Sequence, residues 1–320
     1  MSPKRRWRAP ALGLAALLAT APAASAAPVT SHHSGTHLGD VRVLAHFDRA
    51  AGQAAESIAV EPDGGVVVGM IPARQVVRVS RDGTVQVLVT MPPPPGGGGT
   101  TPVVGVPVVT GVARTHTGAV YFLYSAGQGG LTGIWQVRPQ DKPRLVVPMP
   151  ADTFPNALVV DHERNRFLVT DSTGGRVWQA PLHGGRASVW SADPALAPNG
   201  FFGANGMKVH DGAVWVSNSD RGTIVRIPVT NGRAEIRARG LEGVDDFDFT
   251  GRGTEILAAI NQANELVRVS PDGVRETLLD AGDGMRGTTA VVVRGSRAYV
   301  TNGANLSGTD SNLLLADLHR

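Results

Sequence analysis

The sequence predicts an all-β fold, a six-bladed β-propeller, from three observations. Short apolar segments separated by turns rich in Gly, Asp or Arg recur six times along the chain. Helical patterns are almost absent after residue 26. A strand-like segment that precedes the first repeat can complete the last one. Repeats of about 40–50 residues, with several strands in each, are typical of propeller blades.

Each repeat has an apolar strand, a tight turn and a second apolar strand, and most repeats add a third strand with a Val-x-Arg-Val pattern. The repeats begin 55, 45, 49, 40 and 44 residues apart, at Glu56, Gly111, Asn156, Asn205, Asp245 and Thr289. The long first interval contains the proline- and glycine-rich segment 91–107. This composition predicts a surface excursion between strands and not a domain linker.

The two ends of the repeat region are expected to share one blade. The sixth repeat has three strand-like segments, the last at 312–318 (NLLLADL), and its fourth strand is expected from 41–47 (VRVLAHF). This pairing would close the ring and leave no open sheet edge. An open β-sandwich is the alternative, and six repeats in phase argue against it.

The first 26 residues have the pattern of a secretory signal peptide. Basic residues at 4–8 precede an apolar stretch at 9–18, and Ala-Ser-Ala follows at 24–26. The apolar stretch is shorter than the roughly 20 residues that cross a bilayer. We expect cleavage near Ala26, a secreted or extracytoplasmic protein, a flexible leader at 27–38 and a propeller domain at 39–320. The Sec and twin-arginine export routes both stay open.

Charge and cysteine content exclude several function classes. The chain has 30 basic and 27 acidic residues. Four basic residues and no acidic ones lie in 1–26, so 26 basic and 27 acidic residues remain after cleavage. No Lys/Arg cluster remains for nucleic acid or anionic lipid, and we expect a monomer without a membrane span that acts on a small molecule. The absence of cysteine excludes disulfides, thiolate metal sites and a cysteine nucleophile.

Polar residues recur where the predicted innermost strands begin, and blade symmetry directs these starting residues toward one axis. Because the second strand runs antiparallel to the first, its end returns to the same face of the ring. Asp171, Asn218, Asn261 and Asn302 are expected there. Side chains alternate between the two faces of a strand, so Asp246 and Asp248 are expected on one face and Asp245 on the other.

Two carboxylates and two amides in one register suit a hard cation. Glu56, Asn156, Asn205 and Asp245 offer oxygen atoms, the ligands that Ca²⁺ and Mg²⁺ prefer. Without a cation, two buried carboxylates would repel each other and one would take up a proton. Asp and Asn also occur at strand ends simply because they hydrogen-bond nearby backbone. That reading accounts for Asp171 and stays open for Asn218.

Four segments carry a resemblance to a known family: ESIAVEPDG, FPNALVVD, ANGMKVHDG and VDDFDFTGRG. In this order they resemble signatures of the senescence marker protein / gluconolactonase / luciferin-regenerating enzyme family of six-bladed propellers. The resemblance implies that Glu56, Asn205 and Asp245 bind one divalent cation and that Asn156 contacts substrate. Ca²⁺ is the first expectation, with Mg²⁺, Mn²⁺ and Zn²⁺ as alternatives. Ser57, Ala157 and Asp246 depart from the residues that the family often has.

The resemblance implies a metal-dependent hydrolase of a lactone or related cyclic ester. The cation would polarise the carbonyl and acidify a bound water, and Asp245 would orient or deprotonate that water as the catalytic residue. Asn218 and Asn261 are expected to bind substrate from the rim. The alternatives are a non-catalytic propeller of the NHL type, which binds a ligand or protein at the channel mouth, and a lyase or strictosidine-synthase-like propeller.

Overall fold

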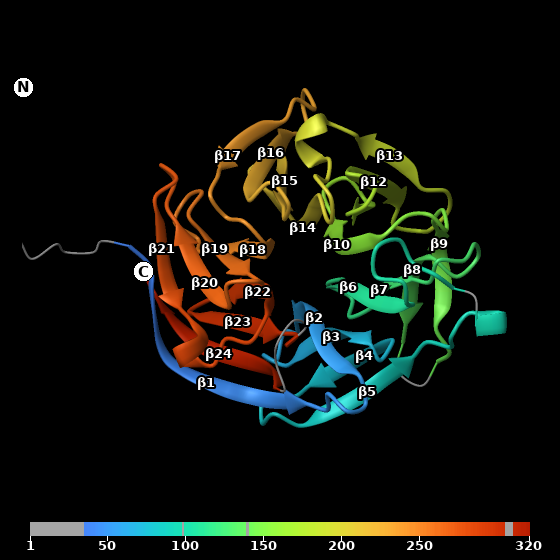
Figure 1. Ribbon diagram of the computed structural model, residues 1–320, viewed down its shortest axis with the longest axis horizontal. Coiled ribbons are helices and arrows are strands. Elements are labelled where there is room, and N and C mark those ends of the chain that lie inside the picture. Colours follow the sequence, from blue (N-terminus) through green and yellow to red (C-terminus); the bar gives the residue numbers. More distant parts are fainter. Residues whose placement is uncertain (1–34, 98, 139–140, 305–309) are drawn as a thin grey trace, which may run out of the picture. The chain divides into compact units, whose positions relative to one another are not determined.

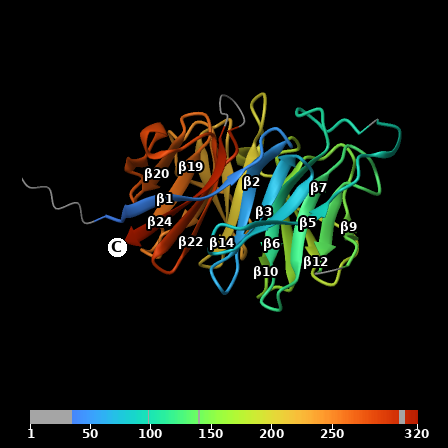
Figure 2. The ribbon, with the colours of Figure 1, turned by 90° about the horizontal axis from the view of Figure 1, so that it is seen from below.

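The structure, a computed structural model, describes residues 35–97, 99–138, 141–304 and 310–320. Six four-stranded antiparallel sheets stand in a ring (Figure 1), which confirms the predicted six-bladed propeller. Seen edge-on, the inner strands run steeply from one face of the ring to the other (Figure 2). The expected signal peptide and residues 27–34 of the expected leader lie outside the described residues. No helix in the described part of the chain is long and apolar enough to span a membrane.

The strands of each blade follow one another from the inside of the ring outward. Blade 1 consists of β2 (Gln53–Val60), β3 (Val66–Pro72), β4 (Gln75–Val79) and β5 (Val85–Thr90). Blade 2 consists of β6 (Val108–Arg114), β7 (Val120–Ser125), β8 (Gly133–Val137) and β9 (Arg144–Pro148). Blade 3 consists of β10 (Pro155–Asp161), β11 (Arg166–Asp171), β12 (Arg176–Pro181) and β13 (Ser188–Ser191).

The remaining blades repeat this order, and short 3₁₀ turns connect some of them. Blade 4 consists of β14 (Ala204–His210), β15 (Ala213–Asn218), β16 (Thr223–Pro228) and β17 (Glu235–Ala238). Blade 5 consists of β18 (Val244–Phe249), β19 (Ile256–Ile260), β20 (Glu265–Val269) and β21 (Arg275–Leu279). Blade 6 consists of β22 (Thr288–Arg294), β23 (Arg297–Asn302), β24 (Ser311–His319) and β1 (His37–Phe47). The 3₁₀ turns are η1 (Pro95–Gly97), η2 (Pro194–Leu196) and η3 (Ala281–Asp283).

Blade 6 closes the ring as the sequence predicts. The N-terminal strand β1 pairs antiparallel with the C-terminal strand β24, for example Ala45 with Leu313. β1 begins at His37, two residues before the expected start of the propeller domain, because the pairing continues to His319. The rings of His37 and His319 stack there with centroids 4.9 Å apart.

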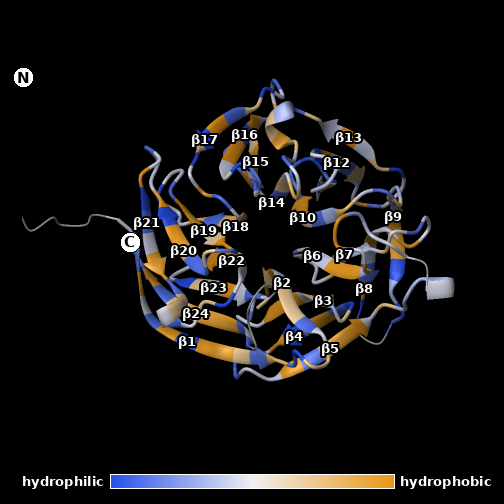
Figure 3. Ribbon diagram, in the orientation of Figure 1, coloured by the Kyte–Doolittle hydropathy of each residue, from blue (hydrophilic) through white to orange (hydrophobic). Residues whose placement is uncertain are grey.

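Apolar side chains fill the spaces between neighbouring blades. Leu168 of blade 3, for example, belongs to one buried cluster with Met207 and Val216 of blade 4. Both faces of a blade are covered by its neighbours, so second strands such as β3 and β15 begin with apolar runs that are fully buried (Figure 3). The innermost strands pair with these buried strands, which positions them around the axis.

Each innermost strand carries one extra residue near its start. In blade 5, Val244 pairs with Ile260 and Phe247 pairs with Ala258, so two residues oppose one. Such a β-bulge bends the strand and re-aims its side chains. The same irregularity occurs in the other five blades. The residues that open the six bulges are Glu56, Thr110, Asn156, Asn205, Asp245 and Thr289. The sequence alignment predicted Gly111 for this position in the second repeat. The structure places Thr110 there instead.

Candidate functional site

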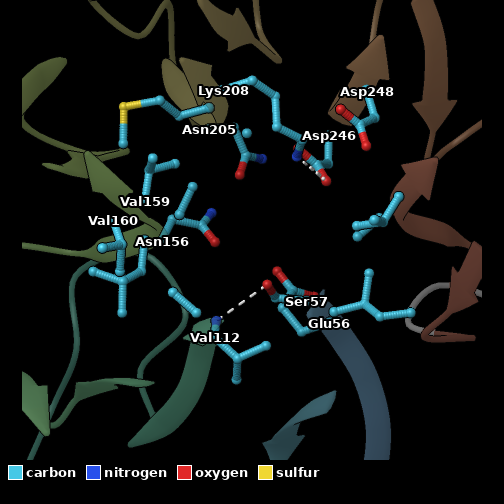
Figure 4. Close-up of a pocket in the computed structure, with 18 of the residues that line it drawn as sticks. Glu56, Ser57, Val112, Asn156, Val159, Val160, Asn205, Lys208, Asp246 and Asp248 are labelled. Atoms are coloured by element: carbon cyan, nitrogen blue, oxygen red, sulfur yellow. Dashed lines mark hydrogen bonds and ion pairs between the residues drawn. The ribbon is translucent and has the colours of Figure 1, made fainter. Parts of the chain in front are cut away.

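The bulges bring four of the sequence-predicted residues to the axis of the ring. Glu56, Asn156 and Asn205 point into one cavity of about 360 Å³ between the inner strands (Figure 4). We call it the channel cavity; it extends along the inner strands to His116 and His162. A second cavity of about 530 Å³ shares Glu56, Asn205 and Asp245 with it and is lined further by Phe154, Phe201, Phe202 and Asn261. We call this the mouth cavity.

Asp245 is held by amide groups on both of its carboxylate oxygens. Asn205 Nδ2 donates to Oδ1 at 2.7 Å, and Asn261 Nδ2 donates to Oδ2 at 3.1 Å. Burial raises the pKa of Asp245 well above its usual range, and the charges of Glu56 and Asp246 raise it further, against the lowering effect of the two amides. Each oxygen accepts one N–H and keeps a lone pair for a further partner.

Glu56 is a partly exposed carboxylate on the cavity wall, and no described residue donates a hydrogen bond to it. Burial, with the nearby charge of Asp246, raises its pKa to about 7. A carboxylate without a donor or a counter-charge is costly to bury in its ionised form. The environment of Glu56 therefore favours either a proton or a cation at this position.

The amide of Asn205 has a defined orientation. Its Nδ2 donates to Ser219 Oγ at 2.9 Å as well as to Asp245. Because both N–H groups of Nδ2 are used as donors, the carbonyl oxygen Oδ1 points away from Asp245 and Ser219 and can accept or ligate another group. An oxygen aimed in this way can serve as a neutral ligand beside Glu56 and Asp245.

The donor set of this site fits a hard divalent cation. Two carboxylates balance a double positive charge, and amide oxygens complete the oxygen ligands that Ca²⁺ or Mg²⁺ takes. The described residues contain no group of three or more His, Cys, Asp or Glu side chains that could hold a metal. Amide and water oxygens would therefore have to supply the rest of the coordination around Glu56 and Asp245.

Hydroxyl groups from the preceding blade hold the backbone of the bulges. Thr170 Oγ of blade 3 donates to the Asn205 carbonyl at 2.6 Å, and Ser217 Oγ of blade 4 donates to the Asp245 carbonyl at 2.8 Å. Thr289 Oγ of blade 6 donates to the Ala55 carbonyl, beside Glu56, at 3.0 Å. These contacts fix each site residue relative to the blade before it. Sequence reasoning missed them, although the repeated Thr-Asp-Ser and Ser-Asn-Ser endings of second strands were a signal.

The residues predicted to bind substrate lie in three different places. Asn156 lines the channel cavity and donates to Ser172 Oγ at 3.1 Å. Asn261 lines the mouth cavity beside Asp245. Asn218 is fully buried away from both cavities, where its Nδ2 donates to the carbonyls of Ala195 and Ala197 at 2.9 and 3.0 Å. The structure thus brings Asn156 and Asn261 to the site and leaves Asn218 in a loop contact.

Strand register explains the difference between Asn218 and Asn261. Asn218 pairs with Ala204, the residue before its bulge, and Ile260 pairs with Val244 in the same way. Asn261 therefore lies one residue further along than Asn218 and corresponds to Ser219. Successive side chains of a strand alternate between its faces, so only the later position reaches the bulge.

The channel cavity is also lined by one lysine and two further aspartates, Lys208, Asp246 and Asp248. Lys208 Nζ lies 2.7 and 2.9 Å from the two oxygens of Asp246. Burial raises the pKa of Asp248 to about 6, although Lys208 lowers it. Both Asp245 and Asp246 line the channel cavity. They have different partners, since Asp245 accepts from Asn205 and Asn261 and Asp246 binds Lys208.

Three phenylalanines form a wall of the mouth cavity. The rings of Phe154 and Phe202 stack with centroids 4.8 Å apart, and those of Phe201 and Phe202 lie 4.3 Å apart. Ile71, Val104 and Val108 complete the apolar lining. Val104 belongs to the segment 91–107, so this excursion contributes to the mouth. The adjacent pair Phe201–Phe202 was a sequence signal that went unused.

Sequence comparison gives no relative, and structural comparison gives the fold. No family model matches the chain, and no curated protein matches it significantly. A gluconolactonase from Xanthomonas campestris superposes with a TM-score of 0.63 at 16% identity, over 87% of this chain and 89% of that one. The structural neighbours therefore include gluconolactonases, in agreement with the resemblance carried by the sequence motifs.

Two further neighbours are enzymes of other reaction classes. Virginiamycin B lyase from Staphylococcus aureus has a TM-score of 0.58 at 13% identity, over 89% of this chain and 100% of that one. A PQQ-bound aldose sugar dehydrogenase from Streptomyces coelicolor has a TM-score of 0.64 at 12% identity, over 89% and 99%. At these identities the likeness concerns the propeller fold, because unrelated functions share a fold.

Proposed function

We propose that the protein is a hydrolase of a lactone or related cyclic ester that works with one divalent cation at Glu56, Asn205 and Asp245. One observation carries the proposal. Two carboxylates, Glu56 and Asp245, with pKa values raised by desolvation, face cavities of ligand size, while the nearby cation Lys208 is bound to Asp246 instead. Carboxylates so arranged are expected at functional sites.

A cation held there would supply a Lewis acid that polarises a carbonyl and makes a neighbouring water more acidic. The residues of the chain would do the rest. Glu56 supplies charge from blade 1, and Asn205 supplies a neutral oxygen from blade 4. Asp245, held by Asn205 and Asn261, orients the attacking water and accepts its proton. Asn156, on the neighbouring wall of the channel cavity, contacts the substrate.

Ca²⁺ is the cation that the donor chemistry favours. All four candidate side chains offer oxygen, and no His is among them, which suits hard ions better than Zn²⁺. Mg²⁺ and Mn²⁺ are the next choices, since they also take carboxylate and water ligands.

The test is turnover of a lactone panel by the purified protein before and after chelation. We expect hydrolysis that chelator abolishes and that added Ca²⁺, Mg²⁺ or Mn²⁺ restores. Asp245→Asn is expected to lose turnover, and Asp82→Asn, in an exposed turn, is the matched control for losing one carboxylate.

Two outcomes would replace the proposal. A product with a new double bond and no oxygen from labelled water would make the protein a lyase. Absence of turnover on the whole panel, together with a ligand or protein bound at the mouth, would make it a binding propeller of the NHL type.

A further inference from the structure

Exposed apolar side chains are concentrated at the mouth cavity. Ten large hydrophobic side chains are exposed in the described part of the chain, and four of them lie in two loops beside this cavity: Val103, Val104, Val106 and Phe201. Phe201 is 52% exposed at the edge of the phenylalanine wall. A soluble domain rarely gathers exposed apolar residues without a binding role.

Hydrogen bonds hold the loop that carries the phenylalanines. Asp220 Oδ2 accepts from the backbone N–H groups of Asn199 and Phe201 at 2.7 and 2.8 Å. Asn218 ties down the start of the same loop through Ala195 and Ala197. Asp171 Oδ1 accepts from Phe154 N at 3.0 Å and positions the third ring. The wall is thus built in advance of any ligand, which lowers the cost of binding.

The mouth cavity offers no positive charge to an anionic ligand, and its phenylalanine wall offers little to a polyhydroxylated one. No Lys or Arg is among the described residues that line it, and its charged side chains are Glu56, Asp220 and Asp245. Asp220 is engaged in the loop, and the other two belong to the proposed cation site. A sugar lactone needs several hydrogen-bond donors and acceptors to replace its lost water. Thr110, Ser219, Asn261 and Gln262 line part of the cavity, but the phenylalanine wall has no such group and suits an apolar substituent.

We infer that this site takes lactones or esters that carry an apolar tail, alkyl or aryl, and prefers them to bare sugar lactones. The inference rests on the proposed function and names its substrate class. The ester group lies at Glu56, Asn205 and Asp245, and the tail lies against Phe154, Phe201, Phe202 and Val104. The cavity of about 530 Å³ is within the range that holds ligands of drug size.

The test separates binding from catalysis with uncleavable lactams. Three matched five-membered lactams, unsubstituted, hexyl-substituted and phenylethyl-substituted, are titrated calorimetrically into the purified protein with Ca²⁺ present. We expect the affinity to rise by about two- to fourfold for each methylene that reaches the wall. Phe201→Ser and Val104→Ser should remove most of this gain, while Val274→Ser, at an exposed apolar residue outside both cavities, should keep it. The hexyl and phenylethyl arms decide between an alkyl and an aryl tail.

Lactone turnover by the same variants completes the test. Equal affinities for the three lactams, no measurable binding, or a gain that survives both wall variants would overturn the inference even if lactones are hydrolysed. Tight binding of the tailed lactams without turnover of any tailed lactone would support an apolar binding site at the mouth and would contradict the proposed hydrolase activity.

Discussion

Asn205 Nδ2 lies 2.7 Å from Asp245 Oδ1, which joins the bulges of two neighbouring blades. The contact uses the N–H side of the amide and leaves its oxygen for another partner. It also holds a carboxylate whose pKa burial raises. The amide oxygen of Asn205 and the carboxylate of Asp245 are therefore both available as ligands of one cation.

Replacing Asp245 by Asn should separate activity from stability. Turnover should fall by about 10³-fold or more, because the general base and a ligand charge are both lost. In chelator two effects should oppose each other. The repulsion between Asp245 and Glu56 is gone, but the new amide keeps one acceptor oxygen where the carboxylate accepted two N–H groups, so the free energy of unfolding should change by no more than about 1–3 kcal/mol. Thermal unfolding in chelator checks the second point. A loss well beyond about 3 kcal/mol in chelator, more than one unpaired amide explains, would contradict the proposed conflict between the two carboxylates.

The stability of the cation-free protein should fall as the pH rises. Burial raises the pKa of Glu56 to about 7 and that of Asp245 well above its usual range, whereas both carboxyls titrate near about 4 in the unfolded chain. Between these values the native state binds more protons than the unfolded state, so the free energy of unfolding decreases with pH. Urea unfolding in chelator at about pH 5 and about pH 8 measures this loss.

A cation should reverse the pH effect. Ca²⁺ needs deprotonated carboxylates, so its stabilisation should be larger at the higher pH. Glu56→Gln should flatten the dependence in chelator and reduce the response to Ca²⁺. A stability that rises with pH in chelator would contradict the raised pKa values.

The hydroxyls that hold the bulges should matter for turnover. Ser217→Ala and Thr170→Val remove the donors to the Asp245 and Asn205 carbonyls, and each should weaken cation affinity or kcat about 10- to 100-fold. Ser217→Thr keeps the hydroxyl and should recover most of the loss, which a mere packing role would not predict. Ser188→Ala, on the exposed outer strand β13, is the control.

Asn218 and Asn261 should behave differently although the sequence places them alike. Asn218→Ala leaves two partly buried loop carbonyls without their donor and should cost about 1–3 kcal/mol of stability, with turnover per folded molecule retained. Asn261→Ala should instead lower kcat, because Asp245 loses one of its two amide donors. Urea unfolding and single-substrate kinetics on both variants distinguish the two roles. The reverse pattern would contradict the register argument.

Sequence periodicity was enough to predict the propeller and its closure, because each blade repeats the same apolar strands and its two ends pair. It also placed Glu56, Asn156, Asn205 and Asp245 in one register. It could not place the bulges, because an extra residue in a strand leaves no mark in an apolar/polar pattern. Gly111 was therefore assigned the position that Thr110 occupies.

Loop residues were harder to predict than strand residues. The phenylalanine wall combines Phe154, which precedes β10, with Phe201 and Phe202 from the connection between β13 and β14. Val104 comes from the excursion after blade 1. These contacts depend on how three loops fold over the mouth, which no repeat in the sequence encodes.

The most direct test of the account is calorimetric titration of Ca²⁺ into the chelator-treated protein, with Glu56→Gln and Asp245→Asn titrated beside it. We predict one strong site per chain in the wild type and a loss of affinity of about 10-fold or more in each variant, since each removes a charged ligand. No binding by the wild type, or equal binding by all three proteins, would contradict a cation site at Glu56, Asn205 and Asp245.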